Sequence, residues 1–226
     1  MEIKAILFGA SGMVGKGVLI ECLESPQVTA VLVIGRNSCA MKHPKLKEII
    51  HTNFMDFSSI QDQLEGYNAC YFCLGVSAVG MSEEKYTKIT YDYTLSTAKT
   101  LLELNPEITF CYVSGTGTDS TEKGRSMWAR VKGKTENDLL KLAFKGVYMF
   151  RPGYIQPMKG VRSKVGWYQA LYNIFKPLYP GLKKLFPNYI TSTVQVGLAM
   201  INVTLKGYPT PWLENRHINE LAGTSS

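Results

Sequence analysis

Three glycines near the N-terminus stand at a spacing that suits the binding of a pyrophosphate. Gly9, Gly12 and Gly15 are three residues apart, follow the apolar run of residues 2–8, and open a helical pattern that begins near Met13. In a strand–turn–helix unit the first glycine permits a tight turn, the second lets the backbone approach the phosphates, and the third lets helix and strand pack closely. Backbone N–H groups at the helix N-terminus would then face the phosphates. The alternative is a plain tight turn that binds nothing.

The end of the second apolar run indicates which dinucleotide would bind. Proteins that bind NAD usually carry an Asp or Glu about 20 residues beyond the glycine loop, where it bonds the ribose hydroxyls. Here the run of residues 28–34 leads into Gly35-Arg36-Asn37. The planar fork of an arginine donates two hydrogen bonds to phosphate oxygens, so Arg36 favours a 2′-phosphate, and Ser11 would add a hydroxyl. We therefore expect NADP(H), with a solvated surface arginine as the alternative for Arg36.

Two further motifs allow more than one interpretation. Asp56 follows the third apolar run and would accept from the adenine amino group, or it caps a helix that begins near Ser58. Cys70 and Cys73 form a C-x-x-C, which can mark a redox pair or half a zinc site. They lie in the β-like run of residues 69–74, where residues three apart point to opposite faces, so their sulfurs should not converge. We expect no metal site, because the three histidines are scattered along the chain.

These candidate residues require a scaffold, and apolar strands alternate with helical patterns along the chain. This alternation predicts an α/β fold, a doubly wound parallel sheet of the Rossmann type. The predicted strands are residues 2–8, 28–34, 48–52, 69–74, 108–113, 147–150 and 216–219, and the predicted helices are residues 13–24, 58–64, 82–104, 127–144 and 191–205. We expect one domain over residues 1–226, because 226 residues suffice for one sizeable core.

A change of composition after Arg151-Pro152-Gly153 predicts a small helical cap over one end of the sheet, at residues 157–190. This segment is rich in Tyr, Trp, Phe, Lys and Pro. It would pack an apolar face on the sheet, line a substrate pocket, or lie on a membrane surface, and the membrane contact is not favoured. The uncharged stretch of residues 185–205 contains many polar side chains, which argues against a membrane span.

The formal charge of +7 favours phosphate-bearing ligands, nucleic acid or anionic membranes. No nucleic-acid-binding motif is present in the sequence, so we expect no nucleic-acid partner. The five cysteines and the absence of a secretion signal predict a cytoplasmic protein. The oligomeric state is left open.

Taken together, the motifs resemble those of the short-chain dehydrogenase/reductase superfamily. The resemblance is strongest to its atypical branch, the NAD(P)H-binding or nucleoside-diphosphate-sugar epimerase-like proteins that include the Tat-interacting-protein type of oxidoreductase. It covers residues 1 to about 155 well and the rest loosely. It implies a cofactor along the C-terminal edge of the sheet, with the nicotinamide near Ser114 and Gly153. The expected cofactor contacts are Gly9, Ser11, Gly12, Met13, Val14, Gly15, Arg36, Asp56, Phe57, Leu74, Gly75, Lys132, Arg151, Pro152 and Gly153.

The resemblance also implies a reaction centre of Ser, Tyr and Lys, with the Tyr four residues before the Lys. Ser114 and Lys132 match this pattern, but the tyrosine position is Trp128. An indole N–H donates a hydrogen bond and does not ionise at useful pH, so it cannot relay a proton as a phenol does. Ser114, Lys132 through water, Tyr154 or Tyr91 would have to supply that proton. Alternatively, Lys132 is an exposed helix lysine, Ser114 a turn residue and Trp128 a packing residue.

The sequence therefore supports three functions. The first is an NADP(H)-dependent oxidoreductase that acts on a small carbonyl or sugar-like substrate, as Lys132 favours. The second is a non-catalytic NADP(H)-binding redox sensor or scaffold, as Trp128 favours. The third is a sugar-nucleotide epimerase, which also needs a proton relay.

Overall fold

The computed structural model describes residues 1–161, 186 and 188–223. Within these residues, seven parallel strands form one sheet in the order β3-β2-β1-β4-β5-β6-β9. The strands are β1 (Ile3–Phe8), β2 (Val28–Gly35), β3 (Leu46–Ile50), β4 (Ala69–Phe72), β5 (Thr109–Val113), β6 (Gly146–Arg151) and β9 (Trp212–Glu214). The predicted doubly wound parallel sheet is thereby confirmed. The predicted cap falls mostly on residues 162–185 and 187, which lie outside the described part.

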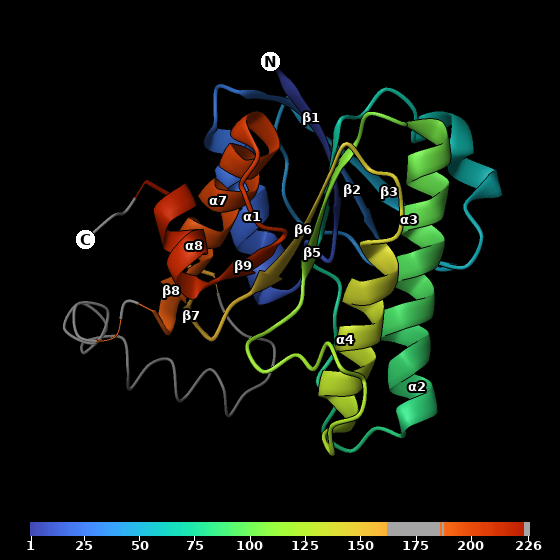
Figure 1. Ribbon diagram of the computed structural model, residues 1–226. Coiled ribbons are helices and arrows are strands. Elements are labelled where there is room, and N and C mark those ends of the chain that lie inside the picture. The colour runs from blue at the N-terminus through green and yellow to red at the C-terminus, as the bar shows by residue number, and fades with distance from the viewer. Residues whose placement is uncertain (162–185, 187, 224–226) are drawn as a thin grey trace.

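Helices cover both faces of the sheet (Figure 1). One face carries α1 (Met13–Glu24), α7 (Thr193–Lys206) and α8 (Asn215–Leu221). The other carries the 3₁₀ helix η1 (Ser58–Gln63), α2 (Glu83–Thr87), the π-helical turn η2 (Lys88–Asp92), α3 (Tyr93–Leu104) and α4 (Met127–Leu139). No helix among the described residues is long and apolar enough to cross a membrane.

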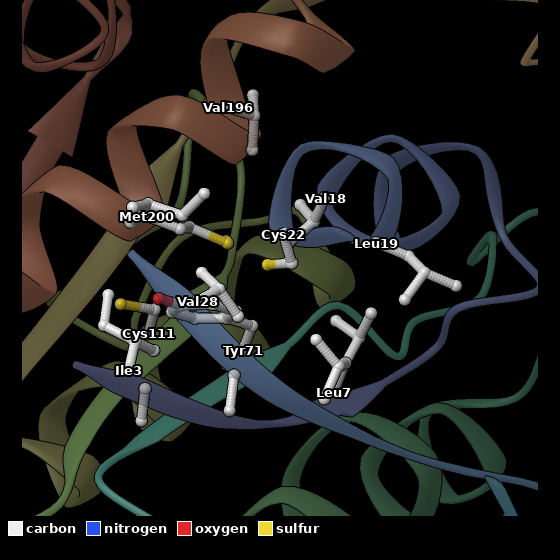
Figure 2. Packing of buried hydrophobic residues seen from close by; sticks show 14 of the residues in the cluster. Ile3, Leu7, Val18, Leu19, Cys22, Val28, Tyr71, Cys111, Val196 and Met200 are labelled. Carbon is white, nitrogen blue, oxygen red and sulfur yellow. The ribbon is translucent and has the colours of Figure 1, made fainter. Parts of the chain in front are cut away.

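Each face has its own apolar core. Figure 2 shows Val18 and Cys22 of α1 and Met200 of α7 packed over Tyr71 and Cys111 of the sheet. The close approach of α1 and α7 depends on two glycines: a Cβ on Gly17 would lie 2.5 Å from the Thr193 Cβ, and a Cβ on Gly197 would lie 2.6 Å from the Glu21 Cγ. The cysteine pair is split between the cores, because Cys70 faces α3 and α4 whereas Cys73 packs toward α1. The expectation that the two sulfurs do not converge is therefore confirmed.

Two predicted helices differ from the sequence-based expectation. The predicted helix over residues 82–104 is interrupted by η2, a widened turn that hydrophobic periodicity does not reveal. The helix predicted to reach residue 144 ends at Leu139, and Phe144 instead stacks on Phe110 with ring centroids 5.2 Å apart.

The predicted strand over residues 216–219 is wrong, because these residues belong to α8. A capping box fixes the start of this helix: the Glu214 side chain accepts from the backbone of His217, and the His217 side chain accepts from the backbone of Glu214. The strand of this region is β9, which ends just before the helix. A small second sheet, β7 (Tyr154–Gln156) with β8 (Ile190–Ser192), was not predicted.

Candidate functional site

The glycine loop joins β1 to α1 and leaves one side of its backbone open. Gly9 has a φ of +81°, and a Cβ there would lie 2.6 Å from the Cys73 backbone. A Cβ on Gly15 would lie 2.2 Å from the Gly9 carbonyl oxygen. These two glycines are therefore required by the turn and by close packing. A Cβ on Gly12 would meet only the Gly9 oxygen, at 3.3 Å, so the outer side of Gly12 is free for a ligand.

A cavity of about 220 Å³ opens beside this loop at the carboxyl ends of β1, β2 and β4. In the sheet, β1 lies between β2 and β4, so the cavity is at the point where the strand order reverses, where α/β sheets bind their ligands. The lining residues are Gly9, Ala10, Ser11, Gly12, Val33, Gly35, Arg36, Asn37, Phe54, Cys73, Leu74 and Gly75. Glycine backbone on one wall and Arg36 on another fit a molecule with a pyrophosphate and a further phosphate.

A histidine not singled out by the sequence shapes one wall of this cavity. The Nε2 of His51 lies 2.8 Å from the Asn53 carbonyl oxygen and 2.9 Å from that of Asp56, so His51 closes the loop that carries Phe54. The ring of His51 also stacks on Phe57, with centroids 5.1 Å apart. Phe57 is itself buried in the core.

The Asp56 side chain forms a hydrogen bond at the start of η1 but is not the N-cap of this helix, which is Phe57. Its Oδ1 accepts from the Ser58 backbone N–H at 2.9 Å, and this bond lowers the pKa of the carboxyl. Asp56 does not line the cavity at the glycine loop. Its contact with adenine stays a prediction.

The three candidate catalytic residues meet at the carboxyl end of β5. Ser114 follows this strand directly, and its hydroxyl lies 2.8 Å from that of Thr118. Lys132, on α4, donates to the Val113 carbonyl oxygen at 3.2 Å. Trp128 lies one turn earlier on α4 and packs against the loop after β5, since a Cβ on Gly117 would lie 3.5 Å from its ring. The structure thus brings the three together, and their catalytic roles stay predictions.

Burial sets the protonation behaviour of Lys132. Desolvation disfavours the ammonium and lowers the pKa of Lys132 to about 8, although the Glu136 carboxylate opposes this shift. Close to neutral pH such a lysine can both hold and release a proton.

The alternative proton donors lie in other networks. The Tyr91 hydroxyl donates to the Asp138 carboxylate at 2.7 Å, and burial together with this carboxylate raises the pKa of Tyr91. The Tyr154 hydroxyl donates to the Gln156 side chain at 2.7 Å.

The Arg151-Pro152-Gly153 segment is held by the elements around it. The Arg151 side chain forms an ion pair with Glu136, which is fully buried, and donates to the Ser120 hydroxyl at 2.7 Å. Thr116 donates its backbone N–H to the Pro152 carbonyl oxygen at 3.0 Å. The guanidinium of Arg151 is therefore engaged within the protein, and its contact with a cofactor stays a prediction.

Asn215, at the carboxyl end of β9, is a polar residue that the sequence analysis missed. Its Oδ1 accepts from the Gly153 N–H at 3.1 Å. Its Nδ2 is buried and has no hydrogen-bond partner among the described residues. A polar residue directly after a strand was the available signal, but it was hidden because this segment was assigned to the wrong element.

Comparison with known proteins confirms the resemblance stated from the motifs. No protein-family model matches the chain. The mitochondrial protein fmp52 of Emericella nidulans is 29% identical over 156 residues, which cover 66% of this chain and 65% of the relative. The protein HTATIP2 of Rattus norvegicus is 25% identical over 159 residues, which cover 69% of this chain and 64% of the relative. The chain thus spans less than two thirds of the length of both relatives.

Solved structures agree on the fold. The Bordetella bronchiseptica enzyme WbmF, solved in complex with NAD⁺ and UDP, superimposes with a TM-score of 0.66 at 14% identity, covering 100% of this chain and 78% of the enzyme. At this identity the likeness concerns the fold alone.

One expectation is overturned by these relatives. We expected a cytoplasmic protein, but the FMP52 relatives, including that of Emericella nidulans, are named as mitochondrial. The cysteine count reports a reducing compartment at most, and it does not distinguish one such compartment from another.

Proposed function

Because the resemblance to the atypical short-chain dehydrogenases/reductases is confirmed, we propose that this chain binds a nicotinamide dinucleotide at its glycine loop and prefers NADP(H). The observation that carries the proposal is the position of Arg36, which lines the cavity directly after β2. No acidic side chain lines this cavity in the described part of the chain, so no carboxylate there would bond a ribose diol or repel a 2′-phosphate.

We further propose that the protein is an oxidoreductase acting on a small carbonyl or sugar-like substrate. The bound cofactor would supply or accept a hydride. Gly12 and the first turn of α1 would hold its pyrophosphate, and Ser114 would donate a hydrogen bond to the substrate oxygen. Lys132 would give the proton to that oxygen, because its pKa of about 8 makes the ammonium a competent acid near neutral pH.

A non-catalytic NADP(H)-binding sensor is the second candidate, and Trp128 favours it. An indole at this position leaves the helix without a phenol. Under either function, the mitochondrial names of the FMP52 relatives support a mitochondrial location. We also propose that the aromatic segment at residues 157–190 belongs to the same single domain.

Titration of the purified protein with NADPH and NADH tests the cofactor preference. A charge-assisted bidentate contact contributes about 1.5–3 kcal/mol, so we expect NADPH to bind at least about tenfold more tightly. Arg36→Ala should remove that difference. The matched control is Arg216→Ala, which removes one positive charge at an exposed position on α8. Equal affinities in the wild type, or an equal loss in both variants, would refute the assignment of Arg36.

Turnover separates the two candidate functions. An oxidoreductase should oxidise NADPH in the presence of some member of a panel of aldehydes, ketones and keto-sugars. A sensor should bind NADPH with the same affinity and leave it intact across the panel.

A further inference from the structure

The ammonium of Lys132 rests on the end of strand β5. Its Nζ lies 3.2 Å from the Val113 carbonyl oxygen and 3.5 Å from the Tyr112 hydroxyl oxygen. It also lies 5.2 Å from the centroid of the Tyr112 ring, within the range of a cation–π contact. Val113 contacts the ammonium only through its main-chain carbonyl oxygen, whereas Tyr112 contacts it through its side chain. Tyr112 is therefore the side chain that fixes where the ammonium lies.

Tyr112 lies in β5, two residues before Ser114, which directly follows this strand, and Tyr112 is fully buried. Residues two apart on a strand share a face, so Tyr112 and Ser114 lie on the side of the sheet that α4 covers. The helix position that would carry a phenol holds Trp128 instead. The phenol beside Lys132 thus comes from the strand below it and not from the helix.

Building on the proposed function, we propose that Tyr112 is a positioning residue that keeps Lys132 in its charged form beside Ser114. The hydroxyl oxygen and the electron-rich ring both attract a cation, and both are desolvated, which strengthens the attraction. Tyr112 does not act as the acid itself, because its hydroxyl is buried beneath the lysine and burial raises its pKa well above the usual value.

The neighbouring strand supplies a matched control. Tyr71 pairs in register with Cys111, is also fully buried, and faces the opposite side of the sheet. Its hydroxyl lies 3.1 Å from that of Thr204. Tyr71 and Tyr112 are therefore equivalent in burial and in strand environment, and Lys132 contacts only Tyr112.

The test is the pKa of Lys132, measured by NMR of the side-chain Cε and Nζ in the protein without cofactor and assigned with Lys132→Met. We expect Tyr112→Phe, which keeps the ring, to lower this pKa. Tyr112→Leu, which removes both the ring and the hydroxyl, should lower it further, so that the total decrease in pKa is about one unit. One unit is tenfold in the acid constant, or about 1.4 kcal/mol. Tyr71→Phe and Tyr71→Leu should cost similar stability and leave the pKa of Lys132 in place. Glu136, the carboxylate that faces Lys132, is paired with Arg151, and none of the four substitutions replaces either residue.

A measurement on the wild type needs no variant to fold. With tyrosine labelled at Cζ, the Tyr112 signal should shift as Lys132 loses its proton near pH 8, and the Tyr71 signal should not. An unchanged pKa of Lys132 in both Tyr112 variants, or equal shifts of the two tyrosine signals, would overturn the proposal. Neither measurement uses cofactor or substrate, so a failure of NADPH binding would count against the proposed function alone.

Discussion

Residue 128 places an indole one turn before Lys132, where the family resemblance implies a phenol. The indole packs against the loop at Gly117 and therefore lies at the same strand end as Ser114. An N–H group there can donate a hydrogen bond to a substrate and cannot exchange its proton. If the protein is an enzyme, the proton must come from a group other than residue 128, and Lys132 is the group that we propose.

Trp128→Tyr tests this division of roles. A phenol one turn before an ammonium restores the missing proton donor, and a positioned acid is typically worth about 10²- to 10⁴-fold in rate. We expect NADPH turnover on simple carbonyls to rise by at least about tenfold, because the phenol can donate a proton to the substrate oxygen. Trp128→Phe is the control, because it makes the same room without a hydroxyl. If both variants gain equally, the change reflects space and not proton transfer.

The sequence identifies residues whose role is local, and it misses those whose role depends on distant contacts. The glycine spacing and Arg36 could be interpreted from their neighbours, because a turn and a strand end are local features. The roles of Tyr112 and Asn215 depend on contacts made across the sheet, with Lys132 and Gly153. No spacing of residues in the sequence predicts these contacts.

At the scale of elements, a buried ion pair joins α4 to β6. Glu136 is fully buried and Arg151 is 14% exposed, with the Arg151 Nε 3.0 Å from Glu136 Oε1. Glu214, at the end of β9, lies 3.6 Å from the same guanidinium. This network fixes the helix that carries Trp128 and Lys132 to β6 and to the edge strand β9.

Arg151→Met should therefore destabilise the protein by about 3–5 kcal/mol, because it leaves a buried carboxylate without a partner. The double variant Arg151→Met with Glu136→Leu should recover much of that loss. Urea unfolding of the wild type, the two single variants Arg151→Met and Glu136→Leu, and the double variant measures the coupling. The exposed pair Lys145–Glu107, at 3.5 Å, is the control, and its removal should change stability by less than about 1 kcal/mol. Additive losses in the Glu136–Arg151 double variant would contradict the pairing.

Most elements follow from hydrophobic periodicity, and the exceptions have physical causes. Helix α1 has the predicted bounds because a glycine turn precedes it and Ser25 and Pro26 follow it. The sequence does not reveal α8, because the capping box at its start consists of Glu214 and His217, an unusual pair for this role. The single π turn η2 lies between α2 and α3, and the apolar pattern over residues 82–104 does not mark it.

Over the whole molecule, the site is assembled at one edge of the sheet from residues far apart in the chain. The glycine loop and Arg36 come from its first strands, and Ser114, Gly153 and Asn215 follow β5, β6 and β9, which are adjacent in the sheet. One face of this arrangement holds a partly buried cation, Lys132. The charge of Lys132 affects the free energy of unfolding of the entire fold, so its desolvation can be measured without substrate.

The free energy of unfolding should depend on pH through Lys132. In the folded state its pKa is about 8, whereas its ordinary value is 10.5. Between these values the unfolded chain binds the proton and the folded chain does not, so this lysine makes stability rise as pH rises from about 8 to about 10.5. Below pH 8 both states are protonated and the full penalty of burying the ammonium remains. Buried cysteines and tyrosines with raised pKa values act in the opposite direction, so the comparison must be with a variant and not with pH alone.

Lys132→Met should therefore be more stable than the wild type below pH 8, by about 1–3 kcal/mol, and the difference should shrink toward pH 10.5. Lys134→Met is the control, since Lys134 is exposed, pairs with Asp138 at 2.8 Å and has its pKa raised by that carboxylate. Its loss should lower stability slightly, with the full difference below about pH 10.5 and a decreasing difference above it, because the folded-state pKa is raised. Urea unfolding of the three proteins across this range measures both differences. A constant offset between Lys132→Met and the wild type would mean that the lysine is not desolvated, and the role of Lys132 as an acid near neutral pH would then lose its physical basis.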